Sequence, residues 1–139
     1  IAERVARDSG AALIIDYGHA ETGYGDTVQG VQDHATQSIF AAPGTVDLCA
    51  HVDFAALAKA GRTGGATIWG PTSQGTFLSQ LGLSARASAL SDASPADATD
   101  IAAAVHRLTH PDEMGTLFKV LAFSSASLRP AGFDARDPI

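Results

Sequence analysis

The order of its predicted elements places this sequence in the α/β class. Three apolar runs, at 11–15, 66–69 and 116–123, alternate with segments of helical periodicity, which is typical of a sheet with parallel strands. The first run contains no polar residue, as expected of a strand that is covered on both faces. Three strands are few for a chain of 139 residues, so we expect further strands upstream of Ile1 to complete the sheet.

The first elements are a helix and a strand. Residues 1–9 place apolar side chains on one side of a helix, and Gly10 ends it. The apolar strand that follows ends in the polar sequence Asp16-Tyr17-Gly18-His19. In open α/β sheets ligands bind beyond the carboxyl ends of the parallel strands. Asp16, Tyr17 and His19 are therefore the first candidates for a site.

The middle of the chain predicts an insertion, a helix and a second strand. Residues 21–44 are rich in Gly, Thr, Gln and Asp, so we expect them to form an insertion over the sheet edge. A helix follows from Asp53 to Ala60, with Asp53 as its N-cap and Gly61 closing it. The second strand, at 66–69, is expected to end at Gly70-Pro71.

Residues 73–110 predict a helical insertion, which we expect to act as a lid or cover. Its parts are a short helix at 73–81, a helix at 83–90, a small acidic linker at 91–100 and a helix at 98–108. The last strand, at 116–123, is followed by a polar tail at 124–139.

Composition narrows the class of protein. With 45% hydrophobic and 17% charged residues the chain is globular. The net charge of -6 leaves no basic face for a phosphate backbone, so we expect no nucleic-acid partner.

A single cysteine, Cys49, excludes an internal disulfide, and we expect it to be a buried inert thiol. No long apolar run predicts a membrane span. Because the chain begins at Ile1 rather than at Met, we expect it to be part of a longer protein.

Common nucleotide and hydrolase motifs fail on inspection. Gly23-Tyr24-Gly25 has Val28 where a dinucleotide fingerprint needs a third glycine. No Gly-Lys-Ser/Thr phosphate loop and no Gly-x-Ser-x-Gly elbow are present. Phosphoryl transfer and serine hydrolysis therefore lose their usual sequence support.

The histidines raise the question of a metal site. His51 and Asp53 could lie on one face of an extended segment, with His19 or His34 as a third ligand. A hydrogen-bonded His51 beside Asp53 as a helix cap explains the same residues, so we expect no metal. The carboxylates also allow another role, because Asp16 and Asp53 could hold a cationic or hydroxylated substrate. Alternatively, Asp16 caps the loop after its strand, and Tyr17 and His19 are surface residues.

Motifs along nearly the whole chain resemble one family in the correct order. They are Leu13-Ile14-Ile15-Asp16-Tyr17-Gly18-His19, Gly25-Asp26-Thr27, Ala42-Pro43-Gly44, Asp47 to Phe54, Gly70-Pro71 with Gln74 and Phe77-Leu78, Leu81-Gly82 with Arg86-Ala87, and Met114 to Val120. On these residues the sequence resembles the MidA family of S-adenosylmethionine-dependent methyltransferases. His51-Val52-Asp53-Phe54 is the most specific segment, and Cys49 departs from the threonine expected beside it.

The resemblance implies a fold and a cofactor. The family's sheet is similar to that of a seven-stranded, Rossmann-like class I methyltransferase with an antiparallel last strand. Residues 1–139 would be the C-terminal portion of that single domain and supply its fifth, sixth and seventh strands. The cofactor would be S-adenosyl-L-methionine. Its glycine-rich loop and ribose-binding acid would lie upstream of Ile1, so we expect no cofactor-binding residue here and an inactive isolated chain.

The resemblance also implies an acceptor. Mitochondrial members resemble protein arginine methyltransferases that act on a subunit of respiratory complex I, so the expected partner is a protein. Asp16, His51 and Asp53 are the catalytic candidates, because a carboxylate can orient a guanidinium and a histidine can take its proton. Tyr17, His19 and Gln74 are candidates for substrate binding.

Two other functions stay open at the level of the sequence. One is a non-enzymatic binding or assembly module that keeps the fold, and the other is a small metal hydrolase built on His19, His51 and Asp53. The abundance of Ala, with more Arg than Lys, favours a bacterial cytoplasmic protein, or the mitochondrial matrix for a eukaryotic one. The oligomeric state is not indicated.

Overall fold

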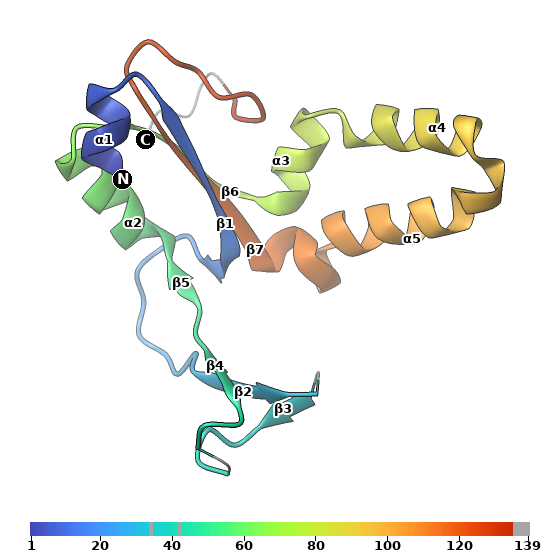
Figure 1. Cartoon of the computed structure of the whole chain (residues 1–139), viewed down its shortest axis with the longest axis horizontal. Helices are drawn as coiled ribbons and strands as arrows, with labels where there is room; N and C mark the ends of the chain where they lie inside the picture. The colour runs from blue at the N-terminus through green and yellow to red at the C-terminus, as the bar shows by residue number, and fades with distance from the viewer. Residues whose placement is uncertain (34, 42, 135–139) are drawn as a thin grey trace.

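The computed structural model describes residues 1–33, 35–41 and 43–134 and has the predicted mixture of helices and strands (Figure 1). His34, Ala42 and the last five residues of the predicted tail lie outside the described residues. In chain order the elements are α1 (Ala2–Arg7), β1 (Ala11–His19), β2 (Gln29–Gln32), β3 (Ala35–Gln37), β4 (Asp47–Cys49), β5 (Val52–Asp53), α2 (Phe54–Thr63), β6 (Thr67–Ser73), α3 (Gln74–Gln80), α4 (Leu83–Ala93), η1 (Pro95–Asp97), α5 (Ala98–Thr109), η2 (Pro111–Gly115) and β7 (Phe118–Ser124).

The main sheet has four strands in the order β5-β1-β7-β6. The last strand, β7, runs antiparallel to both of its neighbours, β1 and β6. The short β5 pairs parallel with the end of β1, through Gly18 opposite Val52 and His19 opposite Asp53. The expected mixed sheet with an antiparallel last strand is therefore confirmed.

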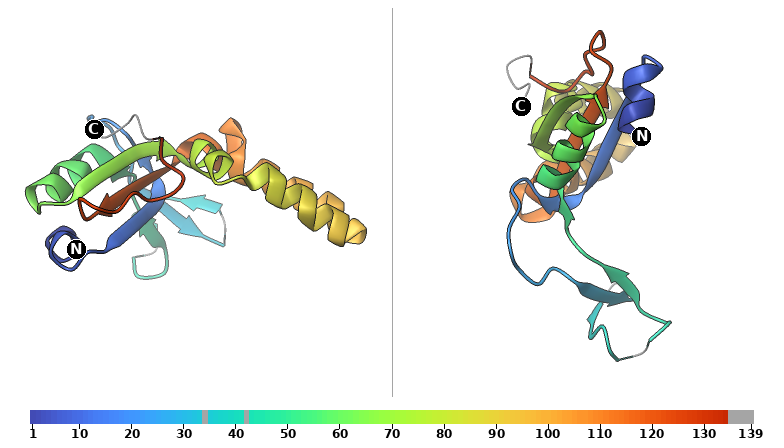
Figure 2. Two further views of the ribbon diagram at one scale, coloured as in Figure 1. Left: turned by 90° about the horizontal axis from the view of Figure 1, so that it is seen from above. Right: turned by 90° about the vertical axis from the view of Figure 1, so that its left-hand side faces the viewer.

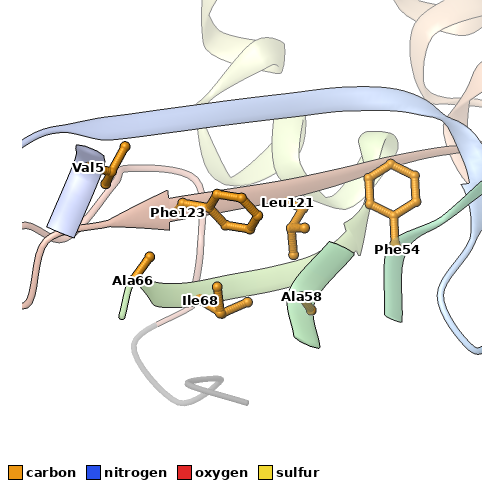
Figure 3. Packing of buried hydrophobic residues seen from close by; sticks show 7 residues of the cluster. All are labelled: Val5, Phe54, Ala58, Ala66, Ile68, Leu121 and Phe123. Atoms are coloured by element: carbon orange, nitrogen blue, oxygen red, sulfur yellow. The ribbon is translucent and has the colours of Figure 1, made fainter. Parts of the chain in front are cut away.

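One face of this sheet carries the core. Seven buried residues from α1, α2, β6, β7 and the turn before β6 pack together there (Figure 3): Val5, Phe54, Ala58, Ala66, Ile68, Leu121 and Phe123. Partly buried Ala12 and Ile14 of β1 pack against this cluster. Apolar burial of this kind is the main stabilising contribution to a small domain. Helix α2 therefore holds the strands that lead to the candidate site.

The opposite face of β1 is open in the described part of the chain. Side chains alternate along a strand, and on this face Leu13 is 51% and Ile15 is 45% exposed. The expectation that β1 is covered on both faces is therefore not met within the described residues.

Several predicted boundaries were wrong because tertiary contacts override local signals. Strand β1 continues to His19, because it pairs with β7 as far as Tyr17 and then with β5. The polar residues after Ile15 thus belong to the strand itself. Helix α2 continues past Gly61, which is buried where an added Cβ would lie 2.6 Å from atoms of Ile68 and Phe123. Strand β6 continues through an irregularity in its pairing with β7 between Trp69 and Thr72.

The insertion predicted at 21–44 does not lie over the sheet edge. With β4, which follows it, it forms a second antiparallel sheet, β3-β2-β4, that projects away from the main sheet (Figures 1 and 2). We call the whole excursion, residues 20–51, the arm. The arm leaves the main sheet after β1 and returns at β5, so both of its ends lie at the carboxyl end of β1.

The helices predicted within residues 73–110 are present as α3, α4 and α5. Helices α4 and α5 lie side by side and extend from the sheet as a hairpin (Figure 1). The linker predicted at 91–100 was wrong, because α4 continues to Ala93 and the turn η1 leads directly into α5. The turn is fixed by the Ser94 hydroxyl, which donates to Asp97 at 2.6 Å. In the described residues, no helix is long and apolar enough to cross a membrane.

Candidate functional site

A cavity of about 480 Å³ lies at the carboxyl end of β1, where the arm leaves and rejoins the main sheet. Its walls come from the end of β1, the first part of the arm and the segment that enters α2. They are His19, Glu21, Gly23, Tyr24, Gly25, Thr27, His51 and Asp53. The parallel pairing of β1 with β5 brings His19 close to His51 and Asp53, although these lie more than thirty positions later in the sequence.

Tyr17 and His51 form the aromatic side of this site. Their ring centroids are 5.8 Å apart in an edge arrangement, and Tyr17 makes a similar contact of 5.7 Å with Phe118. The backbone N–H of His51 donates to Thr27 Oγ1 at 3.3 Å. A hydrogen bond with the Cys49 thiol is the main cause that raises the pKa of Tyr17 above its ordinary value. Cys49 is half-buried, so the prediction that its thiol is buried was wrong.

Asp53 is held by two donors. Its Oδ1 accepts from the backbone N–H of Ala56 at 2.9 Å, and its Oδ2 accepts from the Thr22 hydroxyl at 2.8 Å. These donors, with Ala56 first, lower the pKa of Asp53 below its ordinary value of 3.8, because they stabilise the charged form. The N-cap role predicted for Asp53 is confirmed. The carboxylate also ties the beginning of the arm to α2.

His19 is also fixed by a local contact. Its Nδ1 lies 2.6 Å from the carbonyl oxygen of Glu21, and because a carbonyl only accepts, this nitrogen is the donor. In the neutral ring, Nε2 is then the available acceptor. His19 and His51 thus both line the cavity, one from β1 and one from the segment before β5.

Three of the candidates predicted from the sequence do not line the cavity, and Tyr17 reaches it only through its ring contact with His51. Asp16 accepts from the backbone N–H of Tyr17 at 2.8 Å and, by strand alternation, lies on the opposite face of β1 from Tyr17 and His19. Gln74 is 6% exposed, and its Nε2 donates to the carbonyl of Leu108 at 2.9 Å, which joins α3 to α5. Asp16 stays a separate candidate near the same end of the sheet. Gln74 has a structural partner.

The sequence reasoning missed the contribution of the arm. Glu21, Tyr24 and Thr27 line the cavity, and Thr22 holds Asp53, yet none of them was a candidate. The available signal was the hydroxyl- and glycine-rich composition directly after a strand that ends in polar residues. Only the return of the arm to β1 shows that these residues face His51.

Two other possible sites, a second hollow and a metal centre, have less support from the structure. A larger hollow of about 690 Å³ lies between α3 and η2, but Ser, Thr, Gly, Gln and Pro residues line it, without an ionisable group for proton transfer. Among the residues that the structure describes, no three His, Cys, Asp or Glu side chains converge as a metal ion requires. The geometry therefore lends no support to the set His19, His51 and Asp53 as a metal centre.

The Asp53 cap predicts an acid-dependent loss of stability. Since its pKa is lower in the folded than in the unfolded protein, the carboxylate stabilises the fold above pH 3.8, and this contribution disappears as the pH falls through the lowered value. We expect Asp53→Ala to lower the thermal unfolding midpoint at pH 7 by a few degrees, and the difference from the unmodified protein to shrink toward pH 3.

The control for this measurement is Asp53→Asn, whose side-chain oxygen still accepts from Ala56 but does not titrate. It should retain most of the midpoint at pH 7. Equal midpoints for the alanine variant and the unmodified protein at pH 7 would contradict the stabilising role of the cap.

Comparison with known proteins gives consistent matches. A family model described as "Putative S-adenosyl-L-methionine-dependent methyltransferase" matches residues 1–72. The chain is 37% identical over 124 residues to the Homo sapiens protein arginine methyltransferase NDUFAF7, mitochondrial, which covers 88% of this chain and 28% of that protein. The Drosophila melanogaster homologue is 39% identical over 127 residues, with the same coverage. The chain thus spans about 28% of the length of these curated relatives.

A solved structure matches the fold as well as the sequence. A Burkholderia thailandensis protein, described as a "likely methyl transferase" and crystallised with S-adenosyl-homocysteine, superimposes with a TM-score of 0.82 at 34% identity. The match covers 91% of this chain and 35% of that structure. The folded arrangement of the sheet, arm and helices is therefore shared with a protein that binds the demethylated cofactor.

Proposed function

This chain belongs to the family of S-adenosyl-L-methionine-dependent methyltransferases whose model matches its residues 1–72, and on that premise we propose that the complete protein methylates arginine side chains of a protein. The family resemblance drawn from the sequence motifs is confirmed by this match and by the arginine methyltransferase relatives. In the proposal, this chain supplies the side of the enzyme that receives the methyl acceptor.

The similarity to the structure bound to S-adenosyl-homocysteine is the observation that carries the proposal. Over 91% of this chain the two proteins share the fold and about a third of the aligned residues. The cofactor of this protein is accordingly proposed to be S-adenosyl-L-methionine. Protein arginine as the acceptor is supported by the names of the curated relatives, which are 34–39% identical.

No residue of this chain is proposed as a cofactor contact. The Gly23-Tyr24-Gly25 sequence lies in the arm, whereas a phosphate- or nucleoside-binding glycine loop joins a strand to a helix. We therefore assign the cofactor contacts to another part of the complete protein, and no step on the cofactor is assigned to these residues.

Two open surfaces support the proposal that residues 1–139 are the C-terminal portion of one methyltransferase domain. The face of β1 that bears Leu13 and Ile15 is exposed. The edge of β1 away from β7 is paired only at Gly18 and His19, by β5, among the described residues. A further strand along that edge and helices over that face would complete the domain. Residues 21–44 and 73–110 are proposed as its insertions and 124–139 as its tail.

On the acceptor side, His51 is the proposed base. A guanidinium must lose a proton when its nitrogen becomes methylated, and a histidine at the cavity wall can take it. Asp16 stays a proposed catalytic candidate, because its Oδ2 has no partner in the described part of the chain, but it lies on the other face of β1 and does not share the cavity with His51. Asp53 has both oxygens engaged, so it acts by fixing the segment that carries His51. Tyr17 and His19 are proposed to contact the acceptor.

The cellular setting is proposed from the relatives and the resemblance. A mitochondrial location is proposed if the chain is eukaryotic, because the curated relatives are named mitochondrial proteins. The bacterial cytoplasm is proposed if it is not. A subunit of respiratory complex I is the proposed acceptor on the strength of the family resemblance alone.

Titration of the complete protein with S-adenosyl-homocysteine tests the proposed enzyme. We expect binding of one molecule per chain with a Kd in the micromolar range, since many cofactors bind at about this strength. Circular dichroism establishes that the protein is folded. Absence of binding to the folded, complete protein would contradict the methyltransferase and favour a non-enzymatic binding module.

A further inference from the structure

The negative charge of this chain is concentrated in one stretch. Residues 9–58 contain no Lys or Arg but hold six carboxylates: Asp16, Glu21, Asp26, Asp33, Asp47 and Asp53. The other nine carboxylates are balanced by the nine Lys and Arg residues, all of which lie outside this stretch. The whole formal charge of -6 therefore belongs to the end of β1, the arm and the beginning of α2.

The arm exposes this charge to solvent. Glu21, Asp26, Asp33 and Asp47 are exposed, and none of them makes an ion pair with any residue that the structure describes. The nearest cation by strand register is Lys119, opposite Asp16, and its ammonium instead donates to the carbonyls of Thr116 and Leu117. The arm carboxylates are thus available to a partner.

Apolar side chains lie among these carboxylates. Phe40 is 81% exposed and Leu48 is 65% exposed, and Tyr24 at the cavity wall is also fully exposed. Strand β3 is exposed throughout, and each outer strand of the β3-β2-β4 sheet has one edge without a strand partner in the described ranges. An exposed apolar surface and unpaired strand edges are features of sites that bind extended polypeptides.

The arm is also continuous with the candidate site. Strand β4 ends at Cys49, next to the Tyr17 side chain, and two residues later His51 lines the cavity. The arm projects away from the main sheet (Figure 2, right). Because both of its ends lie at the carboxyl end of β1, a polypeptide that lies on the arm reaches the cavity without crossing the main sheet.

We propose that the arm, through its carboxylates and the exposed Phe40 and Leu48, is the docking surface for a cationic, arginine-bearing segment of the polypeptide that is methylated. This proposal rests on the proposed function and names the part of the protein that selects the substrate. Carboxylates bind guanidinium groups by paired, charge-assisted hydrogen bonds, and apolar side chains pack against the arginine stems. A second copy of this chain is disfavoured as the occupant, because it would bring the same negative charge to the surface.

The test compares two sets of neutralised carboxylates in the complete protein. The arm variant carries Asp26→Asn, Asp33→Asn and Asp47→Asn. The control carries Asp92→Asn, Asp97→Asn and Asp100→Asn on the α4–α5 hairpin, which gives the same change in charge away from the arm (Figure 1). Asparagine keeps a side-chain oxygen, so the bond from the Val28 N–H to residue 26 can persist. The probe is a labelled synthetic peptide of alternating Gly and Arg, followed by fluorescence anisotropy.

We expect the arm variant to bind this peptide about tenfold more weakly than the unmodified protein, and the hairpin control to bind within about twofold of it. Equal weakening by both variants, unchanged affinity of the arm variant, or no binding of the peptide by the unmodified protein would each overturn the docking surface. Binding of S-adenosyl-homocysteine, measured on the same samples, reports separately on the proposed enzyme. If the unmodified protein does not bind S-adenosyl-homocysteine, the proposed methyltransferase is rejected. If it does bind, but the affinity for the peptide is the same in the arm variant, only the docking surface on the arm is rejected.

Discussion

Replacement of His51 by alanine in the complete protein is expected to lower the rate of methyl transfer by about 100-fold or more, the usual contribution of a positioned general base. The side chain lines the cavity, and its ring is held by the edge contact of 5.8 Å with Tyr17. Alanine removes the only part of the residue that can take a proton but keeps the backbone N–H that donates to Thr27. The folded structure around the cavity should therefore persist.

The measurement is the initial rate of methyl transfer from radiolabelled S-adenosylmethionine to an arginine-bearing protein, together with the affinity for S-adenosyl-homocysteine. We expect the affinity of the His51→Ala variant to stay within about twofold, since no cofactor contact is assigned to this residue. His106→Ala is the matched control, because His106 stacks on His110 in the α5 region and does not line the cavity. It should retain the full rate.

Asp16→Ala tests whether the carboxylate on the other face of β1 takes part in methyl transfer. If Asp16 orients the guanidinium, this variant should raise KM for the arginine-bearing acceptor and lower kcat, with little effect on binding of S-adenosyl-homocysteine. Unchanged turnover in both the His51 and the Asp16 variants would reject the proposed acceptor site.

Local signals predicted the elements that depend on local contacts. Asp53 was recognised as an N-cap because its carboxylate needs only a backbone N–H three residues later, at Ala56. The last strand and the helix at 98–108 were found for a similar reason, since each has a clear periodicity. The end of α2 was missed at Gly61, because the signal there is the close approach of Ile68 and Phe123 rather than a turn.

The arm could not be predicted from periodicity. Its strands have three or four residues each, which is too short for an alternating pattern, and their stability depends on pairing across the small sheet. The site was predictable only in part for the same reason. Tyr17 and His19 follow from the end of a strand, whereas their proximity to His51 requires the parallel pairing of β1 with β5.

The pairing of β1 with β5 depends on Gly18, so a substitution there is expected to lower both the stability of the fold and the rate of methyl transfer. A Cβ at Gly18 would lie 2.2 Å from the carbonyl oxygen of Val52 and 2.9 Å from its nitrogen, both backbone atoms that no rotamer change can move. In the Gly18→Ala variant β5 must separate from β1, and the segment that carries His51 and Asp53 must move with it. We expect a loss of about 1–3 kcal/mol in the free energy of unfolding, as for overpacked sites.

Methyl transfer by the Gly18→Ala variant is expected to fall by about 100-fold, because a displacement of about 1 Å at a catalytic group has an effect of this size. Gly10→Ala is the matched control at the other end of β1, since a Cβ there meets no atom within 4 Å. It should leave both the unfolding free energy and the rate nearly unchanged. A Gly18→Ala protein with the full rate would show that the join between β1 and β5 does not position His51. If instead the rate falls and the affinity for S-adenosyl-homocysteine persists, the close approach of two backbones at Gly18 sets the geometry of the acceptor site.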